Sequence, residues 1–132
     1  MIRFAPALAA AALLAGCKSA PETDFIAFSA PGDPTSVASA LGNRIGDCWF
    51  DAGRAEFAGL IYASELNSYA GRPRILVVTK ADPDGLPKLV VEASAARRGT
   101  SVKLFGPLLA TPQAAAIRAD IGRWTAGDTG CV

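Results

Sequence analysis

Four short apolar runs between residues 60 and 105 constrain the fold most, because no segment long enough for a helix separates them. The runs cover residues 60–66, 74–80, 89–95 and 101–105. Turn-forming sequence joins the later runs, with ADPDG over residues 81–85 and RRGT over residues 97–100. Strands joined by such short connections pair antiparallel, because a parallel pair needs a long crossover. The sequence therefore predicts a four-stranded antiparallel meander.

A helix is predicted before these strands. Asp33 and Thr35 are both favourable N-cap residues, and Pro34 suits the first helical position after Asp33. The apolar positions that follow have helical spacing: Val37, Leu41, Ile45 and Cys48. This segment is therefore an amphipathic helix that packs against another element.

A second helix is predicted after the strands, starting at Thr111-Pro112 with the threonine as N-cap and ending near Gly127. Its apolar face comprises Ala114, Ile117, Ile121 and Trp124. The expected fold is thus a single α+β domain over residues 34–132. Its element order is α-β-β-β-β-α, with both helices on one face of the sheet. In this order the domain resembles the helix-grip class of small domains, which includes domains of some outer-membrane assembly lipoproteins.

Alternation along the strands divides the sheet residues between two faces. The face toward the helices is predicted to contain Ile75, Val77, Thr79, Leu89, Val91 and Ala93. The opposite face has Leu76, Val78 and Val90 at its centre, within a rim of charged residues. That face is a docking site, a surface covered by the N-terminal segment, or an ordinary solvated face with a few valines.

Tyr62, Tyr69, Arg72 and Arg74 are additional recognition candidates, because tyrosine and arginine are enriched at the energetic centres of interfaces. We retain the last three as site residues. Together with Leu76, Val78 and Val90 they form the predicted partner-binding set. Trp49 and Trp124 could stack on a sugar or a peptide, but tryptophans on apolar helix faces are more often core residues.

The first 17 residues, MIRFAPALAAAALLAGC, have the pattern of an export signal, with a positive charge at Arg3 and an apolar run from Ala5 to Ala15. As a helix, the stretch from Phe4 to Gly16 would span only about 20 Å, which is short of the roughly 30 Å hydrocarbon core of a bilayer. A transmembrane helix is therefore not expected. An ordinary secretory signal is one interpretation of this stretch.

The sequence Leu14-Ala15-Gly16-Cys17 favours another interpretation, because it resembles the lipobox of bacterial lipoproteins. In that family the cut falls before the cysteine, whose thiol receives a diacylglycerol and whose amine is usually acylated. The resemblance implies a cleaved signal peptide over residues 1–16 and a lipidated anchor and tether over 17–33. Lys18 replaces the aspartate that tends to retain enterobacterial-type lipoproteins in the inner membrane. The resemblance therefore favours the outer membrane, with the domain facing the periplasm.

The tether is rich in proline and small polar residues and has no sustained periodicity. Phe25, Ile26 and Phe28 interrupt this pattern and could form a short edge strand or a staple on the domain.

Two cysteines remain after lipidation, Cys48 and Cys131. In an oxidising compartment an even number of thiols predicts a disulfide, and two separate buried thiols are the alternative.

Composition excludes several function classes. The chain has no histidine, so Ser/His/Asp and Cys/His catalytic sets are ruled out, together with the commonest metal ligand. Asp47 and Asp51 are interpreted as a solvated helix end, and Asp82 and Asp84 as part of a turn. Removing residues 1–16 takes away Arg3, one of the 13 basic residues, so 12 basic residues remain beside 12 acidic ones. Such a balanced charge argues against nucleic-acid binding, which needs a basic surface.

These observations predict a noncatalytic, lipid-anchored module of the cell envelope, with no metal or cofactor. It would bind a protein partner or support an envelope complex. The alternative is a periplasmic protein that binds a small or lipidic ligand between sheet and helices. An enzyme is the third hypothesis. A ligand cavity with convergent polar groups would favour the second hypothesis, whereas a filled core with an apolar outer sheet face would favour the first.

Overall fold

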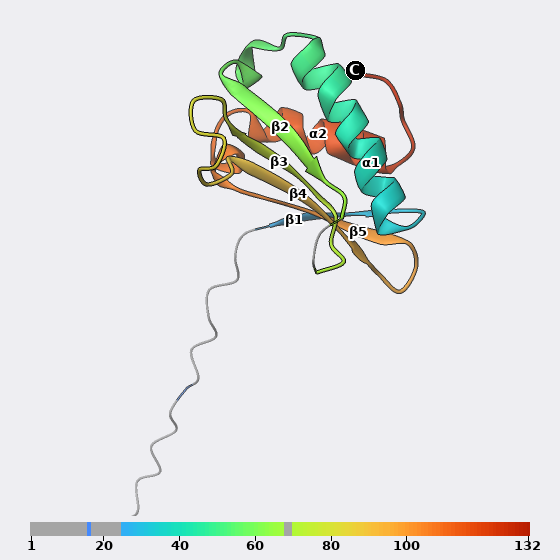
Figure 1. Cartoon of the computed structure of the whole chain (residues 1–132). Coiled ribbons are helices and arrows are strands. Elements are labelled where there is room, and N and C mark those ends of the chain that lie inside the picture. The colour runs from blue at the N-terminus through green and yellow to red at the C-terminus, as the bar shows by residue number, and fades with distance from the viewer. Residues whose placement is uncertain (1–15, 17–24, 68–69) are drawn as a thin grey trace, which may run out of the picture.

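The chain folds into a five-stranded antiparallel sheet and two α-helices, in a computed structural model that describes residues 16, 25–67 and 70–132 (Figure 1). The elements are β1 (Ile26–Ala30), α1 (Pro34–Ile45), β2 (Leu60–Glu65), β3 (Arg74–Thr79), β4 (Leu89–Ala95), β5 (Thr100–Phe105) and α2 (Ala114–Thr125). A π-helical segment, Gly46–Asp51, continues α1, and 3₁₀ turns lie at Ala55–Phe57 and Pro107–Ala110. The predicted α+β class is confirmed.

The sheet contains one strand more than predicted. Its order is β1-β5-β4-β3-β2, so β2 to β5 form the predicted meander and β1 adds to the β5 edge. The prediction of four strands was wrong because Ile26 and Phe28 alternate with small residues and pack their side chains onto the core. Ile26 lies opposite Leu104, and Ala30 lies opposite Thr100. The edge strand considered for this part of the tether is the observed structure.

Helix α1 begins as its sequence predicts. Asp33 is the N-cap, and its carboxylate accepts a hydrogen bond of 3.0 Å from the backbone N–H of Ser36. Two glycines then let the helix approach the sheet closely. A Cβ atom on Gly42 would overlap the hydroxyl of Ser64, and one on Gly46 would overlap the hydroxyl of Tyr62.

Helix α2 begins later than predicted. The hydroxyl of Thr111 donates to the carbonyl of Leu108 at 2.5 Å and closes the preceding 3₁₀ turn, so it does not cap α2. The predicted end at Gly127 is confirmed. Gly127 has a φ of +103°, and its N–H bonds the carbonyl of Trp124 at 3.1 Å. The N–H of Asp128 bonds the carbonyl of Arg123 at 3.0 Å, which completes a Schellman motif.

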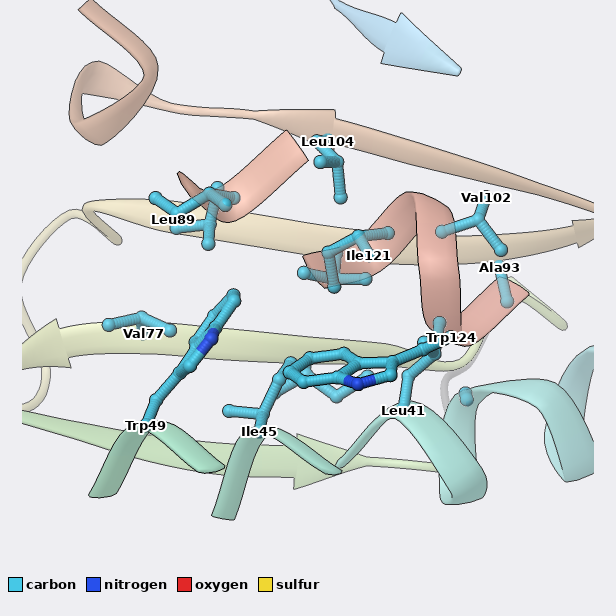
Figure 2. Close-up of a cluster of buried hydrophobic side chains, with 14 of the residues drawn as sticks. Leu41, Ile45, Trp49, Val77, Leu89, Ala93, Val102, Leu104, Ile121 and Trp124 are labelled. Carbon is cyan, nitrogen blue, oxygen red and sulfur yellow. The ribbon is translucent and has the colours of Figure 1, made fainter. Parts of the chain in front are cut away.

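Both helices cover one face of the sheet, and the core lies between them and the strands (Figure 2). The predicted inward-facing residues Ile75, Val77, Leu89, Val91 and Ala93 are all buried, whereas Thr79 is only partly buried. Trp49 and Trp124 are core residues, with ring centroids 5.6 Å apart. Trp49 also stacks on Phe57, at 4.6 Å between centroids. Large side chains therefore fill the space between sheet and helices.

Candidate functional site

The face of the sheet opposite the helices has an apolar band that crosses four strands. The strand register places Phe105 opposite Val90, Val90 opposite Leu76, and Leu76 opposite Ala63. Beside this row, Val78 lies opposite Ile61. We call these six residues the apolar band: Ile61, Ala63, Leu76, Val78, Val90 and Phe105. The structure thus brings together the predicted residues Leu76, Val78 and Val90 on the face where alternation placed them.

Exposure differs within the apolar band. Val78 and Val90 are almost fully buried, at only 5% and 6% exposed. Leu76, Ile61 and Phe105 are partly exposed. The accessible large side chains of the apolar band are therefore Leu76, Ile61 and Phe105.

A charged row borders the apolar band on one side. It contains Lys103, Glu92, Arg74 and Glu65, each opposite the next in the strand register. The Nε of Arg74 lies 2.6 Å from a carboxylate oxygen of Glu65, and both side chains are about two-fifths exposed. Such an exposed pair adds little to stability, about 0–1 kcal/mol. A row of serines, Ser29, Ser101 and Ser94, follows beyond the charges. The outer face is thus apolar on one half and polar on the other.

The predicted arginines meet at one end of this face. Arg72 and Arg74 line a shallow hollow of about 590 Å³ together with Glu65, Asn67 and Glu92. Arg72 is exposed in the connection between β2 and β3. Tyr69 and Cys17 lie outside the described residues, and so does the signal-peptide prediction apart from Gly16.

A groove of about 420 Å³ lies between α1 and the segment that follows α2. Its apolar lining includes Val37, Ala40, Leu41 and Trp124. Arg44 contributes to its rim, and this side chain donates a 2.6 Å hydrogen bond to the backbone carbonyl of Thr129. The groove opens beside the helices, so it is not the space between sheet and helices that the ligand hypothesis assumed.

The C-terminal segment is fixed to the π-helical segment by the predicted disulfide. Cys48 and Cys131 are joined with a Cα–Cα distance of 5.1 Å. Nearby, the indole N–H of Trp124 donates to the carbonyl of Gly130 at 2.8 Å. The last residues are therefore held to the π-helical segment by a covalent bond and to α2 by a side-chain hydrogen bond.

A buried carboxylate, Asp120, organises the polar contacts beneath this segment, and the sequence reasoning missed it. It accepts hydrogen bonds from the indole N–H of Trp49 at 2.8 Å, from Arg54 at 2.7 Å and from Arg123 at 2.8 Å. Burial by itself would raise the pKa of Asp120, but these three donors hold that pKa below its usual value. Asp120 lies 66 and 71 positions from Arg54 and Trp49, so no local motif signals the network.

The acidic residues weighed for catalysis are separated from one another or solvated. Asp47 pairs with Arg44 at 3.1 Å, and its side chain is more than half exposed. Asp51, Asp82 and Asp84 are exposed. Within residues 25–67 and 70–132, no group of three or more Cys, Asp or Glu side chains is placed to hold a metal ion.

Comparisons with family models, curated proteins and solved structures found no match for this chain. In the part of the chain that the structure describes, no helix is long and apolar enough to cross a membrane. The function must therefore be argued from the residues of this chain.

Proposed function

We propose that this protein is a noncatalytic, lipid-anchored module of the cell envelope whose outer sheet face binds a protein partner. Attachment would be through Cys17, in the lipobox-like sequence Leu14-Ala15-Gly16-Cys17. The disulfide between Cys48 and Cys131 supports export, because such bonds persist in oxidising compartments. Lys18 favours the outer membrane, with the domain facing the periplasm.

The apolar band is the observation that carries the partner-binding part of this proposal. It lies on the face away from the helices, where the fold itself does not require large apolar side chains. Contiguous apolar surface with a polar border is characteristic of protein interaction sites. Leu76, Ile61 and Phe105 supply the accessible part of this surface. The charged row next to it would fix the orientation of a partner more than it would add affinity.

Site-specific photo-crosslinking in native envelopes tests the proposal. A photoreactive amino acid would replace Leu76 in one variant and Ser94 in a matched control, because both lie on the outer face in adjacent strands. We expect one defined protein adduct at Leu76 that is absent at Ser94. The same adducts at both positions, or none at Leu76, would contradict the proposal.

The groove beside α1 supports a second candidate function, the binding of a small apolar ligand. Its volume of about 420 Å³ lies within the usual range for small-molecule sites. Native mass spectrometry of the protein isolated from envelopes would detect a bound molecule, and Ala40→Trp should displace it by filling the groove. Ligand-free protein from native envelopes would rule this candidate out.

A further inference from the structure

One end of the sheet gathers the start of β1, the end of β5, the start of β4 and the end of β3. The register shows this, since Ile26 lies opposite Leu104, Phe105 opposite Val90, and Leu89 opposite Val77. Figure 1 shows the start of β1 on the same side of the molecule as the connection between β3 and β4. We call this the anchor end, because the chain from Cys17 enters the domain there.

Two large apolar side chains are exposed at the anchor end. Leu86, in the connection between β3 and β4, is 89% exposed, and Phe25, just before β1, is 49% exposed. The ammonium group of Lys103 lies 4.7 Å from the centre of the Phe25 ring. Lys80 and Lys88 flank the connection that holds Leu86, where Asp82 and Asp84 balance their charges. The surface thus combines exposed apolar side chains with no net charge in the loop.

The short chain between Cys17 and Phe25 limits how far the anchor end can lie from the bilayer. Phe25 follows Cys17 by eight positions, a length that spans at most about 28 Å when fully extended. This reach does not exceed the roughly 30 Å width of a small domain. An anchor at Cys17 therefore keeps the anchor end close to the bilayer and strongly raises the local concentration of lipid around it.

We propose that the anchor end is a membrane-contacting surface, in which Leu86 and Phe25 enter the headgroup region of the phospholipid bilayer that holds Cys17. The inference rests on the proposed function, because it requires acylation of Cys17. Apolar side chains at such a boundary are buried about 5–10 Å deep, with lysines reaching toward the headgroups. Because the loop charges balance, the contact depends on apolar burial and should occur on zwitterionic as well as anionic lipid.

Fluorescence quenching on vesicles tests this contact with the lipidated, disulfide-bonded protein. Acylation at Cys17 and the Cys48–Cys131 bridge leave an introduced cysteine as the reactive thiol, so Leu86→Cys can be labelled with an environment-sensitive fluorophore. Arg98→Cys is the matched control, because Arg98 is exposed in the turn at the far end of β4. That strand spans six residue steps, or about 20 Å.

The vesicles would be phosphatidylcholine alone, or phosphatidylethanolamine with phosphatidylglycerol, each with nitroxide-labelled lipid. We expect several-fold stronger quenching of the label at position 86 than at position 98 on both vesicle types. Equal quenching at the two positions, or quenching on anionic vesicles alone, would overturn the inference. The mass of the N-terminal peptide distinguishes the two proposals. If Cys17 has no lipid, the proposed function fails; if Cys17 is lipidated and the quenching is equal, only the membrane contact fails.

Discussion

Replacing Asp120 with alanine should destabilise the domain strongly, because three donors lose a shared acceptor. The indole N–H of Trp49 is fully buried and would be left without its 2.8 Å hydrogen bond, a loss of about 1–3 kcal/mol. Arg54 and Arg123 would lose their bonds to the carboxylate, although each keeps a second acidic partner. Removing one member of a buried ion pair costs about 3–5 kcal/mol, and partial exposure of both arginines reduces this. We expect a total of about 2–4 kcal/mol.

Equilibrium unfolding in urea at neutral pH, with the disulfide intact, measures this change. Asp47→Ala is the matched control, because its exposed pair with Arg44 contributes about 0–1 kcal/mol. Asp120→Asn keeps an oxygen for Trp49 and should fall between the wild type and Asp120→Ala. An Asp120→Ala variant no less stable than Asp47→Ala, with an unchanged denaturant slope, would refute the reasoning.

Acid should remove the same stabilisation. The pKa of Asp120 is lowered in the folded state, so the unfolded chain binds the proton more readily. The contribution of Asp120 is therefore fully present above its unfolded pKa of about 4, and it is lost as the pH falls through the folded pKa. The difference in the free energy of unfolding between wild type and Asp120→Ala should shrink over that acidic range. A constant difference would contradict the assigned ionisation.

Two further substitution experiments follow from the fold. Replacing both Cys48 and Cys131 with serine should lower the free energy of unfolding by up to about 4.5 kcal/mol, because the bridge spans 83 positions. Urea unfolding of the oxidised wild type and of the variant measures this loss. Equal unfolding midpoints for the two proteins would contradict the prediction. Val77→Lys should abolish the cooperative unfolding transition, because it buries an unpaired charge in the core. Val78→Lys should keep a cooperative transition, since a lysine on the outer face can extend its ammonium group to solvent. Circular dichroism melts distinguish the two, and equal loss of structure would contradict the assignment of the faces.

The strands were predictable because their information is local. The apolar runs, with consecutive valines at 77–78 and 90–91, predicted strands, and the turn sequences between the runs predicted a meander. Because side chains alternate between the two faces of a strand, the residues that face the helices could also be predicted. The disulfide was predictable from the two cysteines that remain if Cys17 is lipidated, because an oxidising compartment would pair them. Strand β1 was not distinguished from the tether in the sequence, because its apolar residues stand in proline-rich sequence and its partners in β5 lie 70 or more positions away.

Other features depend on tertiary context that no local pattern contains. The π-helical continuation of α1 turns Cys48 and Trp49 inward together, and the sequence spacing suggested only an ordinary helix end. Thr111 has the residue type of an N-cap, but its hydroxyl bonds Leu108. Likewise, the apolar centre of the outer face was foreseen, whereas the near-complete burial of Val78 and Val90 depends on neighbours in adjacent strands.

Mass spectrometry of the mature protein from isolated envelopes tests the central claim most directly. A lipid-anchored module predicts an N-terminal peptide that begins at Cys17 and carries a diacylglyceryl adduct, and Cys17→Ser should prevent that attachment. A mature protein that begins at another residue and lacks a lipid adduct would contradict the account.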